Sequence, residues 1–318
     1  MYGKGTTLKK GERLLINGVI NVYKEQGYTS FDVVAKLRGI LKQKKIGHTG
    51  TLDPMAEGVL LVCLGSATKL VDMLTEGTKR YHAVMKLGVT TDTEDITGTV
   101  LSECVLSDDI TEDIVLETLK SFEGEYEQIP PMYSAIKKDG KKLYEYARQG
   151  IEIERKARKV EIYSISDIQI TWPEVSFDVH CSKGTYIRSL CRDVGEKLGC
   201  GATLSGLCRQ SVHGYQLKDS LRLFEIETLV ADEKLASHII PMDSLLQEYQ
   251  AVHIKSVYEN ALMNGNKLKP GSFMEKAGQK PDEIIRVYCG KTFLALYQYH
   301  ADEHIYKPYK MFLDHTSC

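Results

Sequence analysis

The sequence predicts an α+β fold in two parts. Up to Pro241, segments with strand composition and segments with helical periodicity follow one another without a repeat. After Pro241 the sequence pattern changes. Segments 284–289 and 292–299 have strand composition on either side of Gly290-Lys291, which predicts a β-hairpin. A chain of 318 residues is long for one hydrophobic core and sufficient for two. We therefore expect domains at 15–245 and 250–314, preceded by a basic N-terminal extension at 1–14.

The first elements are a strand, a helix, a loop and a second strand. Residues 18–23 have strand composition. Thr29 and Asp32 have capping-box spacing, which predicts that a helix begins after Thr29. The apolar face of that helix comprises Val33, Val34, Leu37, Ile40 and Leu41. The Gly-, Thr- and Pro-rich segment 46–58 is predicted as a loop, and the apolar run 59–64 as a buried strand.

The middle of the chain also contains both predicted helices and predicted strands. We expect helices at 66–74 and 112–122, and a strand at 81–87. Two further strands, 160–170 and 175–181, flank a turn at Trp172-Pro173.

A further helix is predicted after Thr185, with that threonine as its N-cap. Its apolar face comprises Ile187, Leu190, Cys191, Val194 and Leu198. Arg188 and Arg192 lie one turn apart on a different face.

Charge is distributed unevenly along the chain, although the net charge is only −2. Residues 1–45 carry +7, residues 133–160 carry +5 and residues 101–127 carry −8. A nearly neutral total is compatible with a basic face that binds phosphate groups. The simpler interpretation of these runs, and from charge alone the preferred one, is a set of solvated surfaces.

Cysteine usage and hydropathy indicate the compartment. None of the eight cysteines forms a C-x-x-C pair or stands at zinc-finger spacing from a histidine, so we expect no metal site. Scattered thiols in a long chain are typical of a reducing compartment. There is no signal-peptide core and no apolar run near the roughly 18 residues of a membrane span. We expect a cytoplasmic protein without a membrane partner.

The most conspicuous local feature is the loop sequence His48-Thr49-Gly50-Thr51-Leu52-Asp53-Pro54. An Asp-Pro pair is first of all a turn signal, and a lone carboxylate in such a loop is more often structural than catalytic. No G-K-[ST] follows, so the loop is not a P-loop, and no G-x-S-x-G pattern provides a serine nucleophile. No second carboxylate stands nearby in sequence as an obvious acid/base partner.

A resemblance to a known family changes this balance. The chain resembles the TruB family of pseudouridine synthases over nearly its whole length after Leu14. The matching motifs, in order, are 28–34 (YTSFDVV), 47–60 (GHTGTLDPMAEGVL), 79–81 (KRY), 130–137 (PPMYSAIK), 181–190 (CSKGTYIRSL) and 207–209 (LCR), with 262–312 similar more loosely to the RNA-binding PUA domain. The family implies a mixed-sheet pseudouridine synthase catalytic domain and a small β-rich PUA-like C-terminal domain. Segment 128–150 matches the insertion that grips the T arm.

The resemblance implies a transfer RNA pseudouridine synthase that isomerises uridine 55 in the T loop without a cofactor or metal. Asp53 would be the catalytic carboxylate, acting at the ribose C1′ or as a base that starts a glycal route. Arg188 would orient Asp53, by two parallel bonds where geometry permits. The alternative for Arg188 is an ordinary surface arginine of a helix.

The remaining family positions would bind the substrate. Tyr81 would stack on the flipped uracil, Tyr186 and Leu207 would line its pocket, and His48 would hold the rearranged T loop open. Each has a plain structural alternative: a half-buried strand tyrosine, two core residues and a loop histidine with a local hydrogen bond. One departure is that the family's Lys-Pro pair reads Lys24-Glu25 here, which leaves the rigidity of that loop open.

Three rival functions remain. A non-catalytic RNA-binding protein or tRNA-folding helper could use the same scaffold, although Asp53, Tyr81 and Arg188 argue against it. The guide-RNA-dependent relatives of the family have a similar core, but some carry a lysine-rich tail that we do not see here. An unrelated carboxylate hydrolase would need a second carboxylate. We expect a monomer that binds the T arm of transfer RNA, with no guide RNA and no obligate protein partner.

Overall fold

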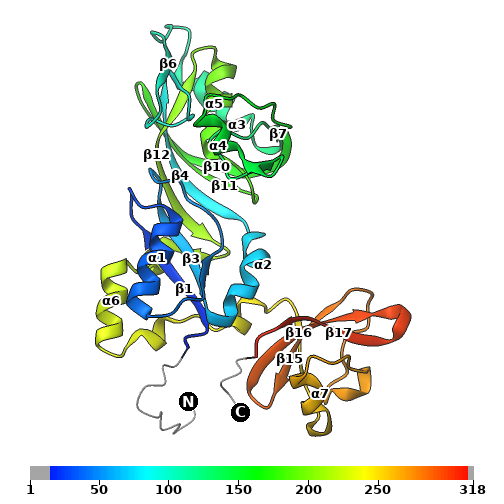
Figure 1. Ribbon diagram of the computed structural model, residues 1–318. Helices are drawn as coiled ribbons and strands as arrows, with labels where there is room; N and C mark the ends of the chain where they lie inside the picture. Colours follow the sequence, from blue (N-terminus) through cyan, green and yellow to red (C-terminus); the bar gives the residue numbers. More distant parts are fainter. Residues whose placement is uncertain (1–14, 314–318) are drawn as a thin grey trace.

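The computed structural model describes residues 15–313, so the expected basic extension at 1–14 lies outside the described residues. Two separate sheets organise the chain (Figure 1). A nine-stranded mixed sheet with helices packed against it is followed by a four-stranded sheet near the C-terminus. The prediction of an α+β fold with a mixed sheet and a β-rich C-terminal region is confirmed. No helix of the described part is long and apolar enough to cross a membrane.

The large sheet has the strand order β1-β3-β12-β4-β11-β10-β7, with β2 paired to β3 and β13 paired to β12. Every pairing is antiparallel except that of β3 with β12. The strands are β1 (Gly18–Lys24), β2 (Ile46–His48), β3 (Glu57–Leu64), β4 (Lys79–Leu87), β7 (Gly124–Gln128), β10 (Arg158–Thr171), β11 (Glu174–Cys181), β12 (Ala202–Val212) and β13 (Tyr215–Gln216). The predicted strands near 18–23, 59–64, 81–87, 160–170 and 175–181 are confirmed.

The segment 46–58 is not wholly a loop, because Ile46–His48 pairs with β3 as strand β2. β12, for which the sequence analysis proposed no strand, joins β3 to β4 at the centre of the sheet. Gly58 permits this junction. It has a φ of +106°, and a Cβ built there would lie 2.3 Å from the carbonyl oxygen of Arg209 in β12. A side chain at this position would therefore force the two strands apart.

Helix α1 (Ser30–Leu41) begins as predicted. The Thr29 hydroxyl accepts from the Asp32 backbone N–H at 3.0 Å, and the Asp32 carboxylate accepts from the Thr29 N–H at 2.8 Å. The N-cap prediction for α5 (Ile187–Leu198) is wrong, because the cap is Tyr186 and no side chain bonds there. The Thr185 hydroxyl instead donates to the Ser182 carbonyl oxygen at 3.0 Å.

The remaining elements are short. The predicted helix at 66–74 is a 3-10 turn (Gly65–Leu70) continued by α2, and the predicted helix at 112–122 is α3. Segment 128–150 forms a lysine hairpin and a single helical turn. The helices are α2 (Val71–Thr75), α3 (Glu112–Lys120), α4 (Leu143–Ala147), α6 (Leu223–Ala231) and α7 (Glu259–Met263), and the small hairpins are β5 (Val89–Thr91) with β6 (Val100–Glu103) and β8 (Lys137–Lys138) with β9 (Lys141–Lys142).

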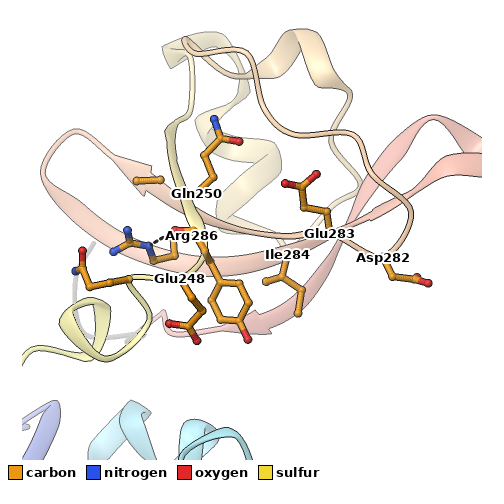
Figure 2. Close-up of a pocket in the computed structure, with 9 residues that line it drawn as sticks. Glu248, Gln250, Asp282, Glu283, Ile284 and Arg286 are labelled. Carbon is orange, nitrogen blue, oxygen red and sulfur yellow. Dashed lines mark hydrogen bonds between the residues drawn. The ribbon is translucent and has the colours of Figure 1, made fainter. Parts of the chain in front are cut away.

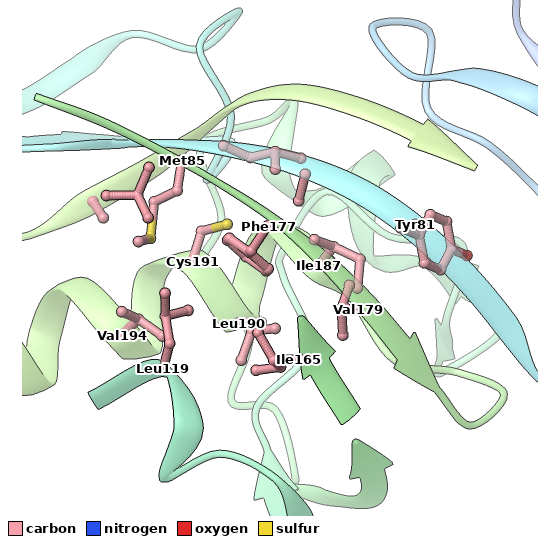
Figure 3. Packing of buried hydrophobic residues seen from close by; sticks show 14 of the residues in the cluster. Tyr81, Met85, Leu119, Ile165, Phe177, Val179, Ile187, Leu190, Cys191 and Val194 are labelled. Carbon is pink, nitrogen blue, oxygen red and sulfur yellow. The ribbon is translucent and has the colours of Figure 1, made fainter. Parts of the chain in front are cut away.

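Apolar side chains cover both faces of the large sheet. Figure 3 shows the cluster in which α3 and α5 pack against β4, β10 and β11, with Tyr81 at one margin. Along β3 the side chains alternate between two other clusters. Leu60, Val62 and Leu64 pack under α1 and α6, whereas Val59, Leu61 and Cys63 face the opposite side. This strand is therefore buried on both faces, as its continuous apolar run predicted.

The C-terminal sheet has the order β14-β15-β16-β17, with strands β14 (Gln250–His253), β15 (Ile284–Cys289), β16 (Thr292–His300) and β17 (Ile305–Met311). Its predicted hairpin, β15–β16, is confirmed. Leu296 and Phe312 belong to the same buried cluster as Val59 and Leu61 of β3. One apolar cluster therefore joins the two sheets, while the C-terminal sheet also has a core of its own that includes Val252, Val287 and Tyr297.

Candidate active site

A cleft of about 410 Å³ opens where β4 and β12 of the large sheet meet the loop before β3, the start of α5 and the 128–150 insertion. Segments distant in the chain therefore supply its walls. The residues that line it are Gly50, Thr51, Leu52, Asp53, Thr75, Lys79, Tyr81, Tyr133, Ser134, Ala135, Tyr144, Ser182, Gly184, Thr185, Tyr186, Ile187, Arg188, Leu207 and Arg209.

Five of the six site residues expected from sequence lie together in this lining. These are Asp53, Tyr81, Tyr186, Arg188 and Leu207. His48 is not part of it. Motifs up to 154 residues apart in the chain thus converge on one cavity, as the resemblance implied.

The Arg188 side chain is 4% exposed, and each of its three guanidinium nitrogens has a polar contact. Its Nε lies 2.9 Å from Asp53 Oδ2, an ion-pair distance without hydrogen-bond alignment. One terminal nitrogen donates to the Thr93 carbonyl at 2.7 Å, and the other donates to the Tyr133 carbonyl at 2.8 Å. The expected pair of parallel bonds to Asp53 is therefore absent, because backbone carbonyls occupy both terminal nitrogens.

Asp53 experiences opposing electrostatic effects. Burial raises the pKa of its carboxyl group, Arg188 lowers it, Asp95 raises it further, and the net direction is upward. Asp95 Oδ2 lies 3.6 Å from the guanidinium of Arg188, so two carboxylates share one arginine. The Thr97 N–H and hydroxyl both donate to Asp95 Oδ1 and hold the second carboxylate in place. Sequence reasoning missed Asp95, which stands 42 positions after Asp53.

Tyr81, Leu207 and Arg209 share one face of the sheet. Arg209 stands opposite Tyr81 across β12 and β4, and Leu207 stands opposite Ala83. The Tyr81 ring is 8% exposed, and burial raises the pKa of its hydroxyl, which keeps that group protonated at neutral pH. The ring therefore forms an apolar wall between the core and the cleft.

Arg209 is a second residue whose place in the cleft the sequence analysis did not foresee. It is 2% exposed, and its Nε donates to the Val59 carbonyl at 2.7 Å. A terminal nitrogen donates to the Gly50 carbonyl at 3.1 Å. Arg209 thereby fastens the loop that carries Asp53 to the central strands. The Leu-Cys-Arg motif was the only signal that could have pointed to it.

Tyr186 is held by its backbone rather than by its ring. Its N–H donates to the Gln128 side-chain oxygen at 2.8 Å, and the Gln128 amide nitrogen donates to the Tyr186 carbonyl at 3.0 Å. Gln128 is the first residue of the insertion and is buried. These two hydrogen bonds connect the first residue of the insertion to the start of α5.

His48 ends strand β2, beside the cleft rather than in it. Its Nδ1 accepts from the Gly50 N–H at 3.3 Å. Burial, with a smaller effect from Arg209, lowers the pKa of the imidazole, so the ring is neutral at pH 7. The bond to Gly50 is the local hydrogen bond expected if His48 has only a structural role. The ring is half-buried.

Lys24 supports the Asp53 loop from behind. The side chain is fully buried, and its Nζ donates to the carbonyls of Ala56, Pro54 and Glu25. The Gly27 N–H also donates to the Pro54 carbonyl, at 2.8 Å. These hydrogen bonds connect the 24–27 loop, which lacks the Pro of the Lys-Pro pair, to the Asp53 loop. Burial lowers the pKa of Lys24 to about 8.

A second hollow, of about 580 Å³, lies beside the C-terminal sheet (Figure 2). Glu248, Asp282 and Glu283 make its lining acidic, and Arg286 is occupied by the Tyr249 carbonyl at 2.9 Å. No residue expected from sequence to be catalytic or to bind substrate lies there. Among residues 15–313 no group of three or more His, Cys, Asp and Glu side chains could hold a metal ion.

Family models and curated proteins match most of this chain. A model described as TruB family pseudouridylate synthase (N terminal domain) matches residues 38–187. One described as tRNA pseudouridylate synthase B C-terminal domain matches residues 188–247. Two curated relatives are named tRNA pseudouridine synthase B. That of Lachnoclostridium phytofermentans is 51% identical over 94% of this chain and 100% of its own length. That of Clostridium kluyveri is 46% identical over 88% and 95%.

Solved structures share the fold at lower identity. A Cbf5-Nop10-Gar1 complex contains a chain that is 29% identical, with a TM-score of 0.70 over 94% of this chain and 86% of that one. An H/ACA RNP bound to a substrate RNA containing 2′-deoxyuridine contains one that is 27% identical, with a TM-score of 0.69 over 93% and 85%.

Proposed function

Because the chain belongs to the TruB family of pseudouridylate synthases, we propose that Asp53 is the catalytic carboxylate with which it converts a uridine of transfer RNA to pseudouridine. Like the relatives named tRNA pseudouridine synthase B, the protein is an isomerase, and its substrate is uridine 55 in the T loop. The observation that carries the assignment of Asp53 is its ion pair with the buried Arg188 in the cleft.

The chemistry requires one bond to break and one to form. Cleavage of N1–C1′ releases uracil, which turns within the cleft and rejoins the ribose through C5. The C5 proton is lost to solvent and N1 gains one, so the product is an isomer. Asp53 acts either as a nucleophile at C1′ or as the base that starts a glycal route. Both routes begin from the carboxylate, which Arg188 favours and burial disfavours.

The uracil would be held by the apolar wall of the cleft. Tyr81 would stack on the extruded base, and Leu207 and Tyr186 would bound it on other sides. Stacking on an aromatic ring stabilises a base by roughly 1–3 kcal/mol, comparable with the few kcal/mol needed to unstack it. His48 would act outside the cleft, where a half-buried neutral ring can support the displaced T loop.

We propose that the enzyme acts in the cytoplasm as a monomer without guide RNA. Curated relatives at 46–51% identity are named for transfer RNA, whereas the complexes above contain chains at 27–29% identity. Tyr133, Ser134 and Tyr144 of the 128–150 insertion reach the cleft, and its β8–β9 hairpin carries four lysines. The insertion would grip the T arm, and the PUA-like C-terminal sheet would add RNA contacts.

The test is tritium release from a transfer RNA transcript labelled at uridine C5. We expect one equivalent per transcript with the wild-type protein. Release should be lost with Asp53→Asn and with a transcript whose T-loop uridine 55 is replaced by cytidine. Turnover by Asp53→Asn would overturn the catalytic assignment. Tight binding without any wild-type release would instead favour the tRNA-folding helper.

A further inference from the structure

A charged pair spans the mouth of the cleft. Lys183, at the tip of the turn between β11 and α5, donates to the carboxylate of Glu76, which directly follows α2. Thr75 lines the cleft on the α2 side, and Ser182 and Gly184 line it on the side of the turn. The pair therefore connects two walls of the opening. Its side chains are 54% and 60% exposed.

The turn that carries Lys183 is anchored at its start, where Ser182 makes two hydrogen bonds to Glu161. The Ser182 hydroxyl accepts from the Glu161 N–H at 2.9 Å, and the Ser182 N–H donates to the Glu161 carbonyl at 2.9 Å. Gly184 has a φ of +77°, a conformation that favours glycine. The backbone thus fixes where the lysine starts, while its long exposed side chain can change partners.

The same part of the cleft has more positive than negative charge. Lys79 and Arg209 also line it, and both donate to backbone carbonyls: Lys79 to Thr75 at 2.7 Å and Gly77 at 2.6 Å, Arg209 to Val59 and Gly50. Neither is within 4 Å of a carboxylate in the described part of the chain. The one carboxylate of the described lining, Asp53, is already paired with Arg188. Among residues 15–313, Glu76 is the only carboxylate that pairs with Lys183.

We propose that Lys183 binds a phosphodiester next to the target uridine and that Glu76 holds this lysine across the cleft mouth until RNA replaces it. The proposal rests on the proposed function, since it assigns a substrate contact at the same cleft. A solvent-exposed ion pair is weak and screened by salt, so a phosphodiester can displace the carboxylate. Lys79 and Arg209, already bonded to the backbone, would add attraction without moving.

Glu76 makes the contact selective. Once Lys183 has turned to the RNA, the freed carboxylate repels any nearby phosphate that is not compensated by the lysine. An RNA that enters without placing a phosphodiester at Lys183 therefore meets net repulsion at the mouth. Removal of the carboxylate should strengthen binding, whereas removal of the ammonium should weaken it.

The experiment measures the affinity of a T-arm hairpin RNA at several salt concentrations, in the Asp53→Asn background. We expect Lys183→Gln to weaken binding by about three- to tenfold and to reduce the salt slope by about 0.7–1. Glu76→Gln should tighten binding a few-fold, and the double variant should bind more tightly than Lys183→Gln, because it no longer carries the uncompensated carboxylate. The control is the exposed pair Lys234 and Asp232, 3.2 Å apart near α6. Lys234→Gln and Asp232→Asn should change neither quantity.

A second arm locates the phosphate. Two hairpins each carry one neutral methylphosphonate, on the 5′ or the 3′ side of the target uridine. In one of them the effect of Lys183→Gln should disappear. If it persists in both, or if Lys183→Gln behaves like Lys234→Gln, the proposal is overturned. Tritium release by the wild-type protein is measured in parallel, so that a failure of the proposed function is recognised separately.

Discussion

Arg188 contacts Asp53 through Nε alone, at 2.9 Å from Oδ2, while carbonyl oxygens of Thr93 and Tyr133 take its two terminal nitrogens. The position of the carboxylate is therefore connected, through one guanidinium, to the 91–97 turn and to the insertion. A residue that keeps the charge but not the planar fork cannot reproduce these contacts.

Arg188→Lys should lower kcat/KM by about 10- to 100-fold, the size of one lost charge-assisted contact. Single-turnover tritium release measures the effect, and thermal unfolding monitors the fold. The matched control is Arg192→Lys, one turn further along α5, which removes bonds to Glu94 and Asp193 away from the cleft. We expect it to lower stability and leave turnover intact. Equal activity losses in both variants would mean that Arg188 acts only through the fold.

The pH dependence of turnover should report Asp53. Burial raises the pKa of this carboxyl above the ordinary value of 3.8, and the reaction needs the ionised form. The kcat/KM should therefore rise with pH through a limb that lies above the range of an exposed aspartate. His48→Gln is the control, since the pKa of His48 is lowered and its loss should not move this limb. A limb that vanishes in His48→Gln would assign the titration to the imidazole.

Arg209→Met should destabilise the protein by about 2–4 kcal/mol, because it leaves the carbonyls of Val59 and Gly50 without their buried donor. Urea unfolding measures the change. The neighbouring Gln210 points to the other face and bonds Asp178 at 3.0 Å. Gln210→Met should cost less than about 1 kcal/mol. Similar losses in the two variants would contradict a special supporting role for Arg209.

Lys24→Met should alter how stability depends on pH. The pKa of Lys24 is about 8 in the folded protein against an ordinary 10.5, so between these values the unfolded chain binds more protons. The contribution of Lys24 to the free energy of unfolding therefore rises with pH across this window, by up to about 3 kcal/mol. The stability gap between wild type and Lys24→Met should widen accordingly. A constant gap from pH 8 to 10.5 would show that burial does not lower the pKa of Lys24.

Local patterns predicted the elements whose chemistry is local. The capping box of Thr29 and Asp32 and the apolar run of β3 both describe contacts made within a few residues or by simple burial. The convergence of Asp53, Tyr81 and Arg188 followed from long motifs in a fixed order, not from periodicity. Their catalytic roles remain predictions for the experiments above.

Contacts between distant segments were invisible to the same reasoning. β12 has no clean alternation, because Arg209 and Ser211 are buried polar residues, and Arg209 donates to a backbone carbonyl of β3. Asp95 reaches the site through a turn 42 positions after Asp53, where no local signal marks it. The Thr185 cap failed because the hydroxyl bonds inside its own turn. For β12 and Asp95 tertiary partners decided the outcome, whereas the Thr185 cap lost to a competing local hydrogen bond.

The place of β12 in the large sheet also has a consequence for biosynthesis. β3 and β4 are neighbours in the chain but not in the sheet, and residues 202–212 separate them. While a ribosome is still making the first 200 residues, Asp53 and Tyr81 belong to two unconnected groups of strands. Only when β12 emerges can Gly58 and Arg209 close the seam and the cleft take shape. A nascent chain released before Val212 would therefore leave the edges of β3 and β4 without a partner strand, and it would bind no uridine.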